Sequence, residues 1–329
     1  MHLAPSDHLV QHVKEKYLRS DNTLHVVGVV ANPVRYNSRY RLAREFIARM
    51  KQTPHVELYV VESAFGDRVH EITEKGNPKH LQLRTKSEIW TKENMINLGV
   101  QHLLPRDWKY VAWIDMDVEF RNPGWALETI HQLQHFPILQ PWQTVVNKGP
   151  TENGMKLYPS TGWQIHKGIS PVKKDGHTNG DPYVFGHCGY AWACTRAFWE
   201  NVRGLVDFAI LGSADHHMAM GCRGLYSRSV HGLMKGPFLE HLELWQTRAM
   251  QVTHGVVGYV PGGIEHNFHG PMHRRNYVGR WNILIDHKYN PVTDLRHDDQ
   301  GMIQITKPEL EYAIRLYNRS RYEDSIEED

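Results

Sequence analysis

The chain has 329 residues, 40% of them hydrophobic and 22% charged, and its formal net charge is +2. This length predicts one large or two medium domains, and the composition excludes a disordered chain and a disulfide-stapled miniprotein. The balanced charge gives no overall attraction to nucleic acid or to an anionic membrane. The 23 histidines are unusual, and they supply many potential proton carriers and metal ligands.

The cysteines and the apolar runs bear on where the protein works. Cys188, Cys194 and Cys222 form no C-x-x-C pair, so we interpret them as buried small hydrophobic residues in a reducing compartment. The longest apolar runs, such as residues 26–31, are shorter than the roughly 18 residues of a membrane span. Charged residues interrupt the first segment of the chain, which argues against a signal peptide. We therefore expect a cytoplasmic protein without integral membrane association.

The first part of the chain alternates helices and strands. The apolar periodicity predicts helices over residues 5–19, 38–50 and 86–104, and strands over residues 24–31, 56–61 and 110–114. The strands are nearly continuous apolar runs, which is typical of strands buried on both faces. Strands that alternate with helices predict an α/β fold with a mostly parallel sheet flanked by helices.

The pattern loosens beyond residue 120. Residues 147–187 are rich in Gly, Pro, Asn, Lys and His, and a long loop of this kind could act as a mobile lid. The acidic residues 323–329 are expected to be solvated and frayed. Further elements are predicted as strands at 189–194 and 258–261 and as helices at 196–202, 240–253 and 307–317.

Two aspartates, Asp115 and Asp117, directly follow the strand predicted at residues 110–114. At the carboxyl end of a buried strand, such a pair can offer oxygen ligands to a hard divalent cation, which in turn neutralises a diphosphate. This D-x-D pair is the first choice for metal chemistry. The alternative is an acidic turn that ends the strand.

Three segments, in the expected order, resemble glycosyltransferases of the GT-A fold. The first is the β-α-β unit followed by the strand that ends in Asp115-Met-Asp117. The second, residues 189–205 followed by Gly212-Ser-Ala-Asp-His-His217, is similar to a galactosyltransferase-type acceptor segment. The third is Gly263-Ile-Glu-His-Asn-Phe-His-Gly270 with the basic residues after it. Together they cover roughly residues 24–285.

The resemblance implies a Rossmann-like GT-A fold, a sugar-nucleotide donor and Mn²⁺ or Mg²⁺ as the cofactor. It implies that Asp215 is the catalytic base. The implied metal ligands are Asp115, Asp117, His269 and His266; the candidate donor-binding residues are Glu62, Lys92, Asn94, Arg35, Arg39, Arg275 and Arg280; and the acceptor-binding residues are His216, His217 and Trp192. Arg35 and Arg39 are included because they follow the first strand. Ala214 stands where the family has an acid, and His216 and His217 also replace acids, which leaves the acceptor contacts open.

Each candidate also has a plain structural alternative. His266 and His269 could be surface residues of a turn bounded by glycines, and His216 and His217 could be structural. Asp215 could cap the helix that begins near it, because aspartate is a favoured N-cap residue. Glu62 could be an ordinary loop carboxylate, and Lys92 and Asn94 could belong to a solvated helix face.

The sequence therefore predicts a catalytic domain over residues 1–285, with a nucleotide-sugar half at about 20–125 and an acceptor half at about 126–285. Residues 286–329 are expected to form a C-terminal helical extension with an acidic tail, which packs on the domain or supports a homo-oligomer.

The predicted activity is metal-dependent sugar transfer from a nucleoside-diphosphate sugar to a hydroxyl acceptor, with inversion by a single displacement. The acceptor could be a glycan, a protein or a hydroxylated DNA base. The basic and aromatic residues 273–281 permit a nucleic-acid acceptor, but they overlap the expected diphosphate site, which explains them without one. One alternative is a zinc-dependent hydrolase that uses the residues near Asp215, including Cys222. The other is a non-catalytic protein that binds nucleotide sugars or nucleic acid.

Overall fold

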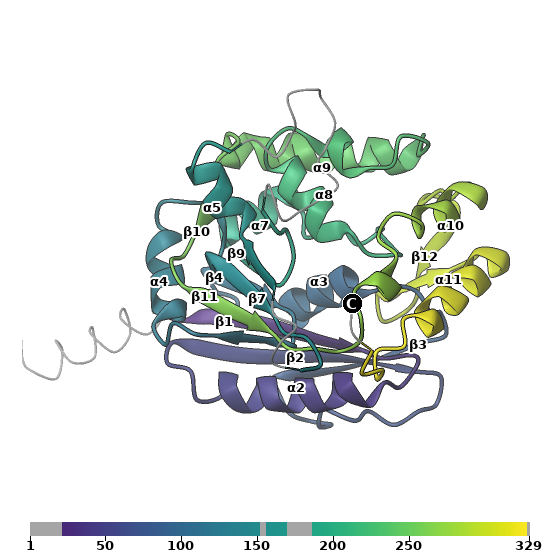
Figure 1. Ribbon diagram of the computed structural model, residues 1–329, viewed down its shortest axis with the longest axis horizontal. Helices are drawn as coiled ribbons and strands as arrows, with labels where there is room; N and C mark the ends of the chain where they lie inside the picture. Colours follow the sequence, from purple (N-terminus) through teal and green to yellow (C-terminus); the bar gives the residue numbers. More distant parts are fainter. Residues whose placement is uncertain (1–21, 152–155, 170–185, 328–329) are drawn as a thin grey trace, which may run out of the picture.

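The structure is a computed structural model that describes residues 22–151, 156–169 and 186–327. A seven-stranded sheet in the order β10-β6-β9-β4-β1-β2-β3 lies at its centre, with helices on both faces (Figure 1). Strand β9 runs antiparallel to β4 and β6, and the other neighbouring strands are parallel. The predicted α/β fold with a mostly parallel sheet is confirmed. The helix expected at residues 5–19 lies outside the described residues.

Apolar side chains cover both faces of the large sheet. Successive residues of a strand face opposite sides, so Val27 joins the core that contains helix α3 while Val26 joins the core that contains helix α2. The strands of this sheet are β1 (Leu24–Ala31), β2 (Val56–Phe65), β3 (His80–Thr85), β4 (Tyr110–Ile114), β6 (Ile138–Gln140), β9 (Ala191–Thr195) and β10 (Gly258–Tyr259).

The helices divide between the two cores. Helices α2 and α4 pack on one face of the sheet, and α3, α7, α8, α9 and α11 contribute to the larger core on the other. Their bounds are α2 (Asn37–Met50), α3 (Lys92–Leu103), α4 (Trp125–Gln132), α5 (Thr161–His166), α7 (Arg196–Val202), α8 (Ala214–Gly221), α9 (Pro237–Thr253), α10 (Trp281–Asp286) and α11 (Pro308–Ser320), with short 3₁₀ turns at Tyr226–Ser229 and His273–Arg275.

A second, four-stranded sheet has the order β5-β11-β7-β8. Its strands are β5 (Val118–Phe120), β7 (Thr144–Asn147), β8 (Lys156–Pro159) and β11 (Gly263–His266). β5 begins directly after the D-x-D pair and runs antiparallel to β11, so that His266 lies opposite Val118. This register brings the D-x-D segment beside a histidine that is far away in the sequence.

Three local expectations were wrong. The helix predicted from residue 86 begins at Lys92, because the backbone N–H of Trp90 bonds to the carbonyl of Ile210 instead. Strand β3, an edge strand with polar and charged alternation, was not predicted. The loop expected at residues 147–187 contains β8 and α5 in its described part, and residues 170–185, where a lid was expected, lie outside the described residues.

The extension predicted at residues 286–329 packs against the start of α3. It contains α11 and also an antiparallel pair, β12 (Leu295–His297) with β13 (Ile303–Ile305). The side-chain amide of Asn94 bonds to the backbone of Gly301 and Ile303 at 3.1 Å each. The expectation of a solvated acidic tail was wrong for Glu323, which is buried because it pairs with Arg39 and Arg321.

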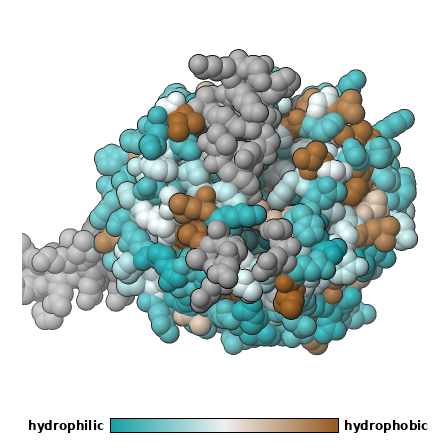
Figure 2. Space-filling model, viewed as in Figure 1, coloured by the Kyte–Doolittle hydropathy of each residue, from teal (hydrophilic) through white to brown (hydrophobic). Residues whose placement is uncertain are grey.

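The surface and the cysteines match their sequence interpretation in part. The face drawn in Figure 2 is mainly hydrophilic, with apolar residues in small separate groups. All three cysteines are buried and unpaired. Among the helices that the structure describes, none is both long and apolar enough to cross a membrane.

Candidate active site

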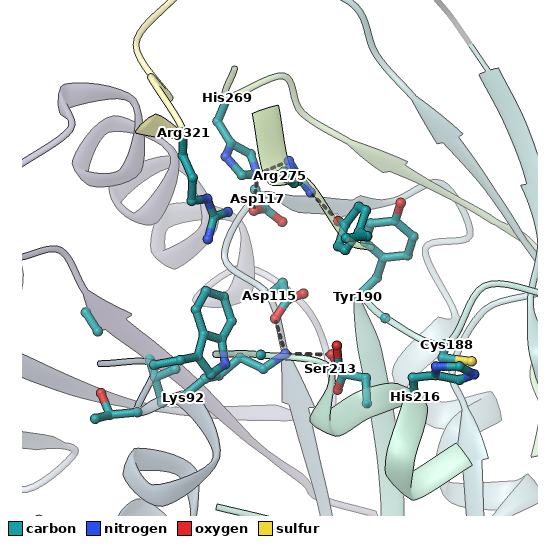
Figure 3. Close-up of a pocket in the computed structure, with 18 of the residues that line it drawn as sticks. Lys92, Asp115, Asp117, Cys188, Tyr190, Ser213, His216, His269, Arg275 and Arg321 are labelled. Atoms are coloured by element: carbon teal, nitrogen blue, oxygen red, sulfur yellow. Dashed lines mark hydrogen bonds and ion pairs between the residues drawn. The ribbon is translucent and has the colours of Figure 1, made fainter. Parts of the chain in front are cut away.

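A cavity of about 630 Å³ opens at the carboxyl ends of β1 and β4. In parallel α/β sheets this edge is the usual position of a ligand site. The walls come from β1 and β4, the first turns of α3 and α8, the loop after β11, and the segment after α11. Figure 3 shows the polar side chains of these elements pointing toward one another.

Asp117, His266 and His269 form a cluster that could hold a metal ion. One ligand atom from each residue lies within 4.8 Å of the others. The His269 Nε2 atom is 3.0 Å from Asp117 Oδ2, and His266 Nε2 is 3.7 Å from Asp117 Oδ1. Burial opposes ionisation of Asp117, yet the neighbouring His266 and His269 hold its pKa well below the usual range.

Two backbone interactions build this cluster from distant segments. The β5–β11 ladder places His266 beside the D-x-D segment, and the backbone N–H of Asn267 donates to the carbonyl of Asp117 at 2.8 Å. His269 then follows on the short loop after β11. The ligand atoms are therefore fixed by main-chain hydrogen bonds rather than by flexible side chains alone.

The chemistry of the cluster fits a divalent metal. Among the described residues, Asp117 Oδ1 is buried without a hydrogen-bond partner. The His269 Nε2 atom lies 3.0 Å from both Asp117 Oδ2 and the Arg275 guanidinium, so the ring nitrogen that faces the cluster is surrounded by polar groups. One carboxylate and two imidazoles suit Mn²⁺ or Zn²⁺ better than Mg²⁺, and three protein ligands leave further coordination positions open.

Asp115 points away from the histidine cluster. Its Oδ1 lies 3.1 Å from Lys92 Nζ (Figure 3), and the same Nζ atom lies 2.9 Å from Asp215 Oδ2. Burial raises the pKa of Asp115 to about 6 against the attraction of Lys92. Burial opposes the charge of Lys92, but Asp115 and Asp215 raise its pKa well above the usual value. Lys92 thus contacts two carboxylates from different segments of the chain. A direct contact between Asp115 and a metal stays a prediction.

Asp215 lies in the first turn of α8, and the N-cap position is taken by Ser213. Ser213 has a left-handed backbone with φ of 77°, and its hydroxyl accepts a hydrogen bond from Arg280. Asp215 therefore faces Lys92 and the cavity instead of acting as the cap. Its neighbour His216 also lines the cavity, and burial lowers the pKa of His216 to about 4.

Five arginines line the cavity and add positive charge to its wall: Arg39, Arg228, Arg275, Arg280 and Arg321. Arg39 and Arg321 are paired with Glu323. Arg275 contacts the Tyr277 hydroxyl at 3.3 Å, and Arg280 contacts Ser213. Among the residues that the structure describes, Arg275 and Arg280 form no ion pair with a carboxylate, so their charge is directed at whatever occupies the cavity.

Five predicted site residues have other contacts and do not line the cavity. Glu62 accepts hydrogen bonds from the backbone of residues 71–73, and Asn94 holds the β12–β13 turn. The indole of Trp192 donates to the Cys188 carbonyl, and His217 Nδ1 lies 2.7 Å from the Ser229 hydroxyl. Arg35 lies 3.7 Å from Glu71 on the surface. Their substrate-binding roles remain predictions that these contacts do not support.

Three residues of the site were missed from the sequence: Tyr190, Arg321 and Glu323. Tyr190 donates a hydrogen bond to Asn147 at 2.7 Å, and its ring stacks on His187. Glu323 belongs to the stretch that was expected to be solvated, and Arg321 lies two residues before it. No periodicity or motif marks Arg321 and Glu323, because their positions depend on how the segment after α11 folds back onto α2.

Comparison with known proteins adds distant likenesses only. No protein-family model matches the chain, and no similar curated protein is found. The catalytic domain of Drosophila beta1,4-galactosyltransferase 7 with xylobiose aligns with a TM-score of 0.37 and 12% identity, covering 87% of this chain and 95% of the other. A mutant of that enzyme with manganese, UDP-Gal and xylobiose gives a TM-score of 0.35, 12% identity and the coverages 87% and 95%.

A 4-diphosphocytidyl-2C-methyl-D-erythritol synthase from Anaerococcus prevotii also aligns. Its TM-score is 0.35 and its identity 10%, with 91% of this chain and 98% of the other covered. Similarities this low do not assign the chain to a family. The functional argument therefore depends on the geometry of the site itself.

Proposed function

We propose that the protein is a metal-dependent glycosyltransferase that moves a sugar from a nucleoside-diphosphate sugar to a hydroxyl acceptor. The observation that carries the proposal is that one cavity brings together three kinds of side-chain group. It holds the cluster of Asp117, His266 and His269, the Asp215 carboxylate, and two arginines that form no ion pair with a carboxylate among the described residues. Metal, anion and proton chemistry could thus act on one bound substrate.

Asp117, His266 and His269 would hold the metal, with Mn²⁺ preferred over Mg²⁺ because two of the ligands are imidazoles. When bound, the metal supplies Lewis-acid stabilisation of the negative charge on a departing diphosphate. The resemblance to GT-A enzymes, in which a D-x-D segment has this role, agrees with the position of Asp117 in the turn between β4 and β5.

Arg275, which lies beside the metal cluster, and Arg280, which lies beside Ser213, would bind the diphosphate. A guanidinium presents planar donors that match phosphate oxygens, and a charged hydrogen bond of this kind contributes about 1.5–3 kcal/mol. Arg280 is buried and is oriented by Ser213, so little of its conformational freedom remains to be lost on binding.

Asp215 would act as the general base. Its carboxylate would take the proton of the acceptor hydroxyl while that oxygen bonds to the anomeric carbon and the bond to the diphosphate breaks. One such displacement inverts the anomeric configuration. Lys92 holds Asp215 and Asp115 in place and keeps the two carboxylates from repelling each other. The acceptor, whether glycan, protein or hydroxylated DNA base, is not specified by these contacts.

The zinc-hydrolase alternative is less well supported. It needs metal ligands near Asp215, but His217 bonds to Ser229 and Cys222 is fully buried in the core. Among the described residues, the cluster that meets the geometric requirements of a metal site is the one at Asp117.

A thermal-shift screen of sugar nucleotides with and without Mn²⁺ tests the proposal. A ligand at 100 times its dissociation constant should stabilise the protein by about 2.7 kcal/mol. We expect a Mn²⁺-dependent shift for one nucleotide class, UDP being the first probe, and its loss in Asp117→Ala. Asp215→Asn should keep the shift but lose transfer, which also separates an enzyme from a non-catalytic binding protein. No shift with any nucleotide would contradict the proposal.

A further inference from the structure

Glu323 approaches the candidate metal cluster from a segment with no assigned role. Its side chain is 2% exposed, and its Oε2 atom lies 3.6 Å from the Nδ1 atom of His269. Nδ1 faces away from Asp117 and has no hydrogen-bond partner among the described residues. At 3.6 Å the two atoms are slightly too far apart for a hydrogen bond, so a small approach would form one.

The protonation of His269 explains why this carboxylate matters. A neutral imidazole carries one proton, on either Nδ1 or Nε2. His269 can bind a metal through Nε2, the atom that faces Asp117, only if its proton is on Nδ1. A buried Nδ1–H needs an acceptor, and histidines that bind metals usually donate this proton to a carboxylate, a carbonyl or water. Glu323 is the carboxylate at that position.

The structure holds Glu323 firmly in this place. Arg39 and Arg321 both pair with its carboxylate, and its backbone carbonyl accepts a hydrogen bond from Ser38 at 3.1 Å. The neighbouring Asp324 accepts hydrogen bonds from the backbone N–H groups of residues 37 and 38 at 2.8 Å each. The segment after α11 is therefore tied to the first turn of α2.

The loop that carries His269 is fitted to the same segment. Gly270 has a left-handed backbone with φ of 87°, and a β-carbon added there would lie only 2.7 Å from the α-carbon of Glu323. The backbone of the loop thus approaches residues 322–323 as closely as glycine allows. This contact is independent of the side-chain ion pairs.

From these contacts we infer that Glu323 is a positioning residue that fixes the ring orientation and tautomer of His269 for metal binding. Residues 321–324 then form part of the metal site although they contribute no ligand. The inference rests on the proposed function, since it assumes that Asp117, His266 and His269 bind the metal.

The test measures Mn²⁺ affinity of the full, metal-free chain from the electron paramagnetic resonance signal of free Mn²⁺. Glu323→Met removes both carboxylate oxygens while keeping a side chain of nearly the same length. This variant should raise the dissociation constant for Mn²⁺ about 10–100-fold. Glu323→Gln keeps an acceptor oxygen and should recover much of the affinity. Asp324→Asn, which alters a carboxylate of the same segment that does not contact His269, should bind Mn²⁺ nearly as the unaltered chain does.

Equal affinities in Glu323→Met and the unaltered chain would overturn the inference while leaving the proposed function intact. Equal weakening by Met and Gln would also overturn it, because the carboxylate would then act through its charge alone. If the unaltered chain binds no Mn²⁺, the inference and the metal dependence of the proposed function both fail.

A measurement on the unaltered chain avoids the risk that Glu323→Met does not fold. With ¹⁵N-labelled histidine and Zn²⁺ bound, long-range ¹H–¹⁵N spectra should show His269 protonated at Nδ1, with His269→Gln identifying its signals. A ring protonated at Nε2, or one that binds the metal through Nδ1, would overturn the inference.

Discussion

Replacing Lys92 with methionine should destabilise the metal-free protein far more than the loss of an ordinary surface lysine. The Lys92 ammonium lies 3.1 Å from Asp115 and 2.9 Å from Asp215, and its side chain is only 13% exposed. At an effective dielectric constant of about 20, each contact gives about 5–6 kcal/mol of attraction before desolvation is subtracted. Removing one partner of a buried pair typically costs about 3–5 kcal/mol, because the remaining charge has no partner. We expect a loss in that range.

Lys79 provides a matched control. Its ammonium lies 2.9 Å from Glu57, the same distance as between Lys92 and Asp215, but its side chain is 48% exposed. An exposed pair contributes about 0–1 kcal/mol, so Lys79→Met should have little effect. The two lysines thus differ in burial and in the second aspartate that Lys92 contacts.

Urea unfolding in the presence of a chelator at pH 7.5 provides the measurement. The slope of the unfolding free energy against urea concentration should stay the same in all variants, so that a lower midpoint urea concentration reports lower stability. Asp215→Asn introduced into Lys92→Met should recover part of the loss, since it removes one of the two unpaired charges. Equal losses for Lys92→Met and Lys79→Met would refute the claim that the buried Lys92 ammonium neutralises the partly exposed Asp115 and Asp215.

Three further predictions follow from the site. Burial keeps His216 neutral and lowers its pKa to about 4 from the usual 6.5. Its contribution to stability is therefore present above pH 6.5 and is lost as the pH falls toward 4, a loss of about 3 kcal/mol in the free energy of unfolding. In urea unfolding, His216→Gln should lose less stability than the unaltered chain between pH 7.5 and 5. Gly270→Ala should lower the free energy of unfolding by more than Gly66→Ala does, because both glycines have positive φ but a β-carbon at Gly66 meets nothing within 4 Å. Thermal unfolding of the two variants checks this prediction. Equal effects would contradict the close packing at Gly270. Arg280→Gln should weaken nucleoside-diphosphate binding about 10–100-fold by calorimetry, while Arg274→Gln, which loses an exposed pair with Glu327, should not.

The parts of the fold that sequence predicts well are those with strong local patterns. The apolar run of β1 and the apolar spacing of α2 predict the first and last residues of these elements to within one residue. The predicted bounds of α11 differ from the observed ones by a few residues. The D-x-D pair is visible because it ends such a run. β3 was missed because its polar alternation indicates an edge strand only when the neighbouring strand is known.

The rest of the site depends on contacts between segments that are distant in sequence. The sequence marks His266 and His269 through a resemblance, but only the pairing of β11 with β5 brings them to Asp117. The division of labour between Asp115 and Asp117 was not predictable, since it depends on Lys92 reaching one carboxylate and not the other. Glu323 was assigned to a solvated tail because acidic composition says nothing about the two arginines that bury it.

The ladder between β5 and β11 has a consequence for how this protein tolerates change. Because β5 and β11 pair through the main chain beside Asp117 and His266, surface loops within residues 121–262 can change in length without moving these side chains, provided that β7, which also pairs with β11, is kept. Substrate preference could therefore diversify through that stretch while the metal chemistry stays constant. Under the proposed function, the surface loops of this stretch would select the acceptor while the metal cluster acts on the donor, and chimaeras that exchange such loops would test for new specificities.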